Sequence, residues 1–253
     1  MRIISLGSGS KGNATLIESS SSRLLIDCGF SVKQLDSRLA QAGVDPDSID
    51  AVLVTHEHQD HLRGAAAFAR RHHAVLRGTM GTFRGVDIGK DVQFEPINSH
   101  AGSLQVAGFE VIPYPVPHDS REAVQFVIRA EDVSFGMLTD AGSITPHAVA
   151  LLAECDALLL EFNHDEEMLR NGPYPWSLKK RVAGDLGHLS NTQSVGLLRQ
   201  LDTSRLQHLL AAHLSDKNNH PKHVRASLAG VDEKLDDLLV ILEQDRISDW
   251  FLL

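Results

Sequence analysis

The chain has 253 residues, of which 42% are apolar and 23% charged, the ordinary composition of a folded globular protein. Its apolar runs are far shorter than the ~18 consecutive residues that a membrane-spanning helix requires, so we expect no membrane segment. The 24 basic and 33 acidic residues give a net charge of −9, which disfavours broad electrostatic adhesion to nucleic acid. A phosphate-containing substrate would therefore have to be captured by local contacts.

The compartment follows from the N-terminus and the cysteines. The first residues show neither a signal-peptide nor a transit-peptide pattern. The two cysteines, Cys28 and Cys155, are too few for a disulfide framework or a thiolate zinc site, and free thiols suit a reducing compartment. We therefore expect a cytoplasmic protein.

Strand patterns alternate with helical patterns along the chain. The first part has strand patterns at residues 2–6, 14–17, 23–27 and 51–55, and a helical pattern at 32–42. A helical pattern at 62–71 then precedes a β-rich region with strands at 92–97, 104–115, 123–130 and 133–139. The last part pairs helices at 146–154, 192–201 and 221–229 with strands at 156–162, 206–212 and 238–242.

These elements predict one layered α/β domain over residues 1–253. The only low-complexity segment, residues 19–22, is explained by a short turn between two strands. Two β-rich halves that are each flanked by helices would stack sheet on sheet with the helices outside. We therefore expect a four-layer αββα sandwich.

A dense cluster of candidate metal ligands follows the strand at 51–55. It reads His56-Glu57-His58-Gln59-Asp60-His61. A zincin motif would need a second histidine where Asp60 stands, which excludes that kind of metalloprotease. His56 and His58 are two residues apart, so they point to the same side of an extended segment, while Asp60 and His61 can face a second position at the start of a helix. The cluster therefore suggests two metal ions.

Two metal ions spaced ~3.5–4 Å apart need further ligands, preferably with a bridging carboxylate. Three polar residues stand at the ends of apolar runs, where side chains gather at one rim of a sheet: His118, Asp140 and His213. We expect them to complete the metal site.

The order of these motifs resembles the metallo-β-lactamase superfamily. The resemblance rests on Asp27 after an apolar run, the cluster at 56–61, His118, Asp140 and His213, and it spans most of the chain. It implies that His56, His58 and His118 hold one metal, that Asp60, His61 and His213 hold the other, and that Asp140 bridges them. Asp27 would hydrogen-bond a ligand histidine and fix its tautomer, although a plain strand-capping role is the alternative.

Shorter segments are similar to the YycJ (WalJ) branch of small bacterial members. They are residues 7–13, 163–165, 187–191, 213–215 and 218–221. This resemblance implies a phosphodiesterase that acts as a 5′-to-3′ exonuclease on DNA. The chain is too short for the inserted nucleic-acid-clamping domain of larger RNA-processing and DNA-repair relatives.

Substrate contacts are less clearly indicated. His188 and His164 could each donate to a phosphate or protonate a leaving oxygen, and an ordinary loop histidine explains each almost as well; we favour His188 as the catalytic residue. Lys179, Lys180 and Arg181 could bind phosphate, although three basic residues are more often a solvated face. The glycine-rich residues 7–13 could approach a phosphate, but a tight turn explains them equally well.

The site predicts a hydrolase in which two cations share a hydroxide nucleophile that Asp60 helps to orient. Nitrogen and oxygen ligands suit Zn²⁺ best, with Mn²⁺ and Fe²⁺ as alternatives. The leading hypothesis is a phosphodiester hydrolase acting on DNA ends. The alternatives are hydrolysis of a small cyclic phosphodiester, thioester or lactone, and a non-catalytic metal-binding regulatory module.

Overall fold

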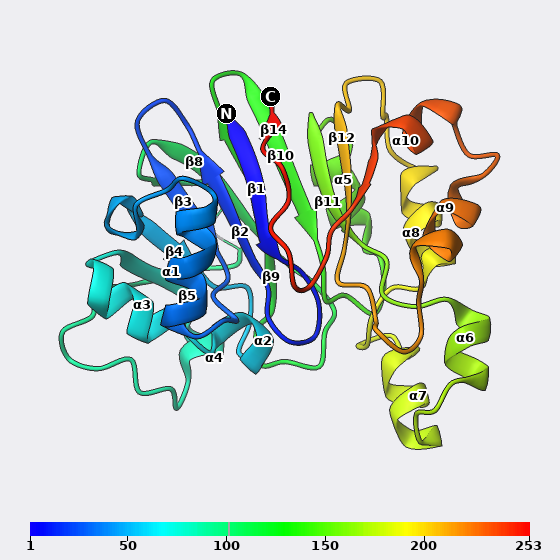
Figure 1. Ribbon diagram of the computed structural model, residues 1–253, viewed down its shortest axis with the longest axis horizontal. Coiled ribbons are helices and arrows are strands. Elements are labelled where there is room, and N and C mark those ends of the chain that lie inside the picture. Colours follow the sequence, from blue (N-terminus) through cyan, green and yellow to red (C-terminus); the bar gives the residue numbers. More distant parts are fainter. Residues whose placement is uncertain (101) are drawn as a thin grey trace.

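The computed structural model describes residues 1–100 and 102–253. In this part of the chain, two seven-stranded sheets stack face to face with helices on both outer faces (Figure 1). The predicted four-layer αββα sandwich is therefore confirmed.

The first sheet is built mainly from the N-terminal half of the chain. Its strands are β1 (Arg2–Gly7), β2 (Ala14–Glu18), β3 (Arg23–Ile26), β4 (Ala51–Leu53), β5 (Val75–Thr79), β6 (Phe94–Ile97) and β14 (Phe251–Leu252). Their order is β14-β1-β2-β3-β4-β5-β6. The pairs from β14 to β3 are antiparallel, and those from β3 to β6 are parallel.

The second sheet follows in the chain. Its strands are β7 (Leu104–Val106), β8 (Phe109–Pro115), β9 (Val124–Ala130), β10 (Val133–Leu138), β11 (Ala157–Glu161), β12 (His208–Ala212) and β13 (Leu239–Ile241). Their order is β13-β12-β11-β10-β9-β8-β7. The strands from β7 to β10 are antiparallel and those from β10 to β13 parallel, so both sheets are mixed.

Helices cover the outer faces of both sheets (Figure 1). Those on the first sheet's side are α1 (Val32–Gln41), α2 (Gln59–Leu62), α3 (Ala65–His72) and α4 (Met80–Phe83), with the 3-10 turn η1 (Pro46–Ser48). Those on the second sheet's side are α5 (Pro146–Leu152), α6 (Glu166–Asn171), α7 (Trp176–Val182), α8 (Asn191–Leu198), α9 (Pro221–Leu228) and α10 (Glu233–Leu238). None of these helices, over the described residues, is long and apolar enough to cross a membrane.

Three apolar layers hold the four structural layers together. The middle layer lies between the sheets and joins residues such as Ile3 and Phe251 of the first sheet to Phe126 and Leu159 of the second. The outer layers pack α1 and α3 on the first sheet and α5, α8 and α9 on the second. Burial on both faces explains why the parallel strands are continuous apolar runs.

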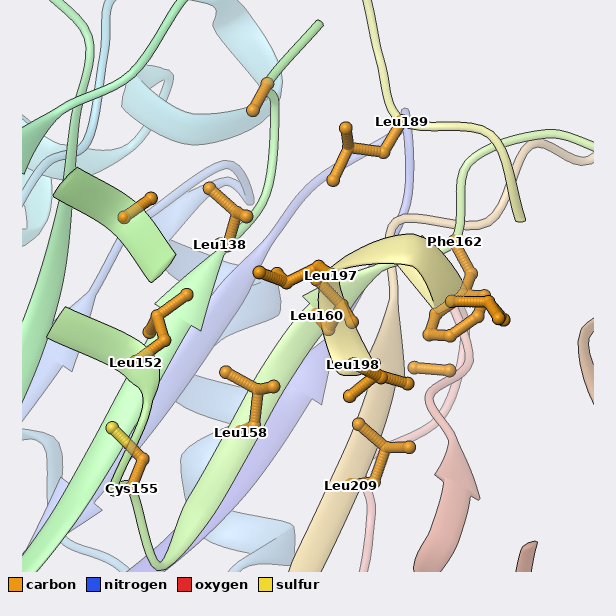
Figure 2. Packing of buried hydrophobic residues seen from close by; sticks show 14 of the residues in the cluster. Leu138, Leu152, Cys155, Leu158, Leu160, Phe162, Leu189, Leu197, Leu198 and Leu209 are labelled. Carbon is orange, nitrogen blue, oxygen red and sulfur yellow. The ribbon is translucent and has the colours of Figure 1, made fainter. Parts of the chain in front are cut away.

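The alternation of side chains is clear in β11. Leu158 and Leu160 point outward and pack under Leu197 and Leu198 of α8 (Figure 2), whereas Leu159 points into the layer between the sheets. The strand ends at Glu161, which is fully buried although it carries a carboxylate. That carboxylate lies at the rim where the candidate site is built.

Two predicted elements were wrong in outline. Residues 104–115 form a hairpin of β7 and β8 instead of one strand, because Ala107 and Gly108 both adopt positive φ and turn the chain. The helix predicted at 62–71 is divided into α2 and α3 at Gly64, where a Cβ would lie 2.1 Å from the Phe30 carbonyl oxygen. The sequence patterns also did not predict β5, α4, α6, α7, α10 and β14.

Candidate metal centre

The candidate residues gather at one rim of the sandwich, where the parallel strands have their carboxyl ends. Asp27 follows β3, Asp140 follows β10 after one residue, Glu161 ends β11, and His213 follows β12. The segment 54–61 leaves β4 and enters α2 at the same rim. Side chains from both sheets therefore meet there, as is usual for sites in α/β proteins.

Three of these residues have an uncommon backbone conformation. Asp27, Asp140 and His213 have φ values of 61°, 52° and 55°, in the left-handed region that residues other than glycine rarely adopt. Such conformations cluster at functional sites, where the surrounding structure maintains them. The common conformation at three strand exits indicates that the rim is built for side-chain placement.

His56, His58 and His118 form the first group of donors, each offering a ring nitrogen within 4.8 Å of the others. The His118 Nε2 and His58 Nδ1 atoms are 3.2 Å apart. His118 Nδ1 donates to the Gly187 carbonyl oxygen at 3.0 Å, which leaves its Nε2 free to ligate. His56 is fully buried, and its Nε2 has no hydrogen-bond partner among the described residues.

Asp60, His61 and His213 form the second group, also within 4.8 Å. Asp60 Oδ2 lies 3.5 Å from His61 Nε2 and 3.4 Å from His213 Nε2. The His61 Nδ1 donates to Asp27 Oδ2 at 2.7 Å, which again leaves Nε2 free to ligate a metal ion.

Asp140 lies between the two groups. Its Oδ2 is 3.2 Å from His61 Nε2, and its Oδ1 is 3.3 Å from His213 Nδ1. One of its carboxylate oxygens also lies within 4.8 Å of a ring nitrogen of His56 and of His61. Asp140 Oδ2 is buried without a hydrogen-bond partner in the described part of the chain, so a bound cation would satisfy it.

Asp27 is held by more than one contact. Besides His61, its carboxylate accepts hydrogen bonds from the Thr55 backbone N–H at 2.8 Å and from the Thr55 hydroxyl at 2.9 and 3.0 Å. Thr55 Oγ1 in turn lies 3.0 Å from His56 Nδ1. The Asp27–Thr55 unit therefore orients one histidine of each group.

Glu161 on the second sheet corresponds to Asp27 on the first, because it also hydrogen-bonds candidate histidines. The sequence patterns did not predict its role. Its Oε1 accepts from His188 Nδ1 at 2.8 Å and from His213 Nδ1 at 3.0 Å. Its Oε2 accepts from the backbone N–H of Leu189 at 3.0 Å and of Ala141 at 3.3 Å. The available signal was a carboxylate at the end of an apolar run, the same signal that singled out Asp140.

Burial and neighbouring charges determine which of these side chains are charged. Burial lowers the pKa of His56 well below its ordinary value, so this imidazole is neutral and can ligate. Burial acts to raise the pKa of Asp140, but the neighbouring His213 and His61 hold that pKa well below its usual range. In the same way burial opposes ionisation of Glu161, yet His188 brings its pKa to about 2. Both buried carboxylates are therefore anionic.

A pocket of about 380 Å³ opens over these residues, with His58, Asp60, Asp140, His188 and His213 in its lining. His188 is one of two predicted substrate contacts that the structure brings to this pocket, and 22% of its side chain is exposed. Arg181 also lines the pocket and forms an ion pair with Asp119.

Three other candidates for substrate contact lie outside the metal pocket. His164, Lys179 and Lys180 line a separate groove between α6 and α7. The glycine-rich segment 7–13 borders the site, because Ser10 lines the metal pocket. Ser8 Oγ accepts from the His213 backbone N–H at 2.8 Å, and the Asn13 side-chain amide donates to the Asp60 carbonyl oxygen at 3.3 Å.

Comparison with known proteins identifies the family. A model described as "Beta-lactamase superfamily domain" matches residues 22–209. The chain belongs to the β-lactamase superfamily. It is 34% identical to the exodeoxyribonuclease WalJ of Streptococcus pneumoniae over 85% of this chain and 81% of that protein. It is 31% identical to the exodeoxyribonuclease YycJ of Bacillus anthracis over 90% of this chain and 88% of that protein.

The fold also matches solved structures of metallo-β-lactamase fold proteins. The metallo-β-lactamase fold protein YhfI from Bacillus subtilis superposes with a TM-score of 0.74 over 98% of each chain, at 16% identity. The resemblance predicted from the order of the histidine and aspartate motifs is therefore confirmed, together with the YycJ and WalJ branch of the superfamily.

Proposed function

We propose that this superfamily member is a metal-dependent phosphodiester hydrolase that degrades DNA from its ends in the 5′-to-3′ direction. The observation that carries the proposal is the pair of donor groups joined at Asp140, in a chain that is 34% identical to an exodeoxyribonuclease over most of its length. Hydrolysis of DNA ends is the activity that both named relatives share.

His56, His58 and His118 would hold one divalent ion, Asp60, His61 and His213 the other, and Asp140 would contact both. The unpartnered His56 Nε2 and Asp140 Oδ2 atoms fit this role, because most buried polar atoms in proteins have a partner and a bound cation would supply one to both. Two bound cations would acidify a water molecule and stabilise negative charge on the phosphoryl oxygens. The donors are nitrogen and oxygen only, which suits Zn²⁺ and also admits Mn²⁺ or Fe²⁺.

The remaining residues of the pocket would act on the substrate. Glu161 holds the Nδ1 of His188, so the Nε2 of His188 is the atom available to a phosphate or to a leaving oxygen. Glu161 is thus a positioning residue for His188. Asp60, besides its proposed role as a metal ligand, is only half-buried at the pocket, where its carboxylate could also orient the attacking water.

A panel of substrates tests the reaction type. The purified protein with added Zn²⁺ or Mn²⁺ is expected to hydrolyse bis(p-nitrophenyl) phosphate and linear DNA, and a chelator should stop both reactions. Faster hydrolysis of a thioester, a lactone or nitrocefin would replace the proposal with acyl hydrolysis. Metal binding without any hydrolysis would favour a regulatory module.

End-labelled DNA tests the direction. A strand labelled at its 5′ end should release the label as the first product, whereas the same strand labelled at its 3′ end should give a series of shortening fragments. Circular DNA should remain intact under the same conditions. Release of the 3′ label first would overturn the 5′-to-3′ assignment.

A further inference from the structure

The groove between α6 and α7 lies next to the candidate metal centre but is separate from its pocket. Both helices project from the rim that also carries α2 (Figure 1). Helix α7 divides the two hollows: Leu178, Arg181 and Val182 line the metal pocket, whereas Trp176, Lys179 and Lys180 line the groove. His164 also lines the groove, and its neighbour Asn163 lines the metal pocket. The wall between the two hollows therefore includes residues 163 and 164 as well as α7.

Trp176 is the most unusual residue of the groove. It is 78% exposed, the largest fraction among the exposed large apolar side chains of the described residues. An exposed indole next to cationic side chains is typical of sites where single-stranded nucleic acid is bound, because every base can stack on an aromatic face.

The charges of the groove favour an anionic ligand. Arg170, Lys179 and Lys180 line it, with Glu166 as its only carboxylate among the described residues. Glu166 Oε1 already accepts a hydrogen bond from the Ser190 hydroxyl at 3.0 Å. Within residues 1–100 and 102–253, none of the three cations has a carboxylate within 4.0 Å, unlike Arg181, which is paired with Asp119. This is a local cationic surface on a chain with a net charge of −9.

We propose that the α6–α7 groove binds an unpaired nucleotide of the DNA strand, with its base stacked on Trp176 and its flanking phosphates near Lys179, Lys180 and Arg170. The proposal rests on the proposed nuclease function and adds a preference for single-stranded ends. The groove volume, about 580 Å³, lies within the range of small-ligand sites. A paired base is already stacked in its duplex, so a blunt end would have to unpair before using the groove.

The two tryptophans of the chain allow a direct binding test. Trp250 lies away from the groove, where the Arg2 guanidinium is 4.0 Å from its ring centroid. Because the chain has two tryptophans, a Trp250→Phe variant leaves Trp176 as the only one. In that variant, a single-stranded phosphorothioate oligonucleotide that resists hydrolysis should quench Trp176 fluorescence. A blunt duplex of the same sequence should bind much more weakly. Equal quenching by inorganic polyphosphate would overturn the stacking model, since polyphosphate has charge but no bases.

Kinetics give a second readout. Loss of one stacked base should raise the KM for single-stranded DNA by about 5- to 150-fold in Trp176→Ala, with a smaller change in kcat, and Trp176→Phe should retain most of the affinity. Trp250→Phe is the matched control. An unchanged KM in Trp176→Ala would overturn the groove while leaving the nuclease function intact. Quenching by the phosphorothioate oligonucleotide in a metal-loaded protein that hydrolyses no unmodified DNA would instead support the groove and contradict the nuclease function.

Discussion

Asp140 is the residue on which the two-metal assignment depends. In Asp140→Ala we expect metal content and phosphodiester hydrolysis to fall together, because two like charges ~3.5–4 Å apart would lose the carboxylate between them. Elemental analysis and a bis(p-nitrophenyl) phosphate assay measure both quantities. Asp249→Ala removes an exposed aspartate and serves as the control. Two tightly held metal ions per chain in Asp140→Ala would contradict the bridging role.

His188 should behave differently from the proposed metal ligands. Its Nδ1 contacts Glu161, so we expect His188→Ala to keep its metal content while kcat falls by ~10²–10⁴-fold, the usual contribution of a general acid or base. Metal analysis and steady-state kinetics separate the two effects, with the exposed His147→Ala as the control. Loss of one metal ion would make His188 a ligand, and an unchanged rate would make it an ordinary loop histidine.

The predicted metal ligands each stood beside a strong local signal in the sequence, and the structure brings their side chains together. His56, His58, Asp60 and His61 were found because four donors in six residues are rare. Glu161 was missed because its partners are 27 and 52 residues away, and only the parallel pairing of β11 with β10 and β12 brings them together. Contacts of that kind depend on tertiary structure.

At the scale of elements, sequence patterns found the long amphipathic helices and the buried strands but not the short helices. Helices α6 and α7 have six and seven residues, too short for an apolar period to become clear. The N-cap of α6 was nevertheless present in the sequence, since Asp165 accepts a hydrogen bond from the Met168 backbone N–H at 2.8 Å, whereas α7 has no side-chain cap. The three consecutive basic residues that suggested one cluster lie on α7 but line different hollows. Arg181 lines the metal pocket, whereas Lys179 and Lys180 line the groove.

This division predicts the salt dependence of DNA binding. Each phosphate neutralised on a single strand contributes a slope of about −0.7 to log K against log salt, so Lys179→Ala/Lys180→Ala should flatten the slope by about 1.4. Fluorescence titrations of the phosphorothioate oligonucleotide between low and high salt measure it. Lys33→Ala/Lys90→Ala removes two exposed lysines from the side of the first sheet and should leave the slope as it is. A slope that survives the first double substitution would locate the DNA elsewhere.

At the scale of the whole molecule, the layer between the sheets joins distant parts of the chain. The two ends lie side by side (Figure 1), and the Leu253 backbone N–H donates to the Met1 carbonyl oxygen at 2.9 Å. The same apolar layer contains Ile3 and Phe251 as well as Leu210. These contacts support the prediction of one domain over residues 1–253.

A single domain should unfold in one cooperative step. We expect the metal-free protein in urea to show the same midpoint by far-ultraviolet circular dichroism and by Trp250 fluorescence in a Trp176→Phe variant. The first signal reports all elements, and the second reports the edge of the first sheet next to β14. Two separate midpoints would divide the chain into independently folding units.

The central claim is that two metal ions at this rim perform the hydrolysis. Its most direct test removes the metals with a chelator, dialyses the chelator away, and follows the rate on single-stranded DNA as Zn²⁺ or Mn²⁺ is added in known equivalents. We expect no hydrolysis in the metal-free protein and a rate that reaches its plateau at two equivalents of metal per chain. Full activity without metal, or a plateau after one equivalent, would contradict it.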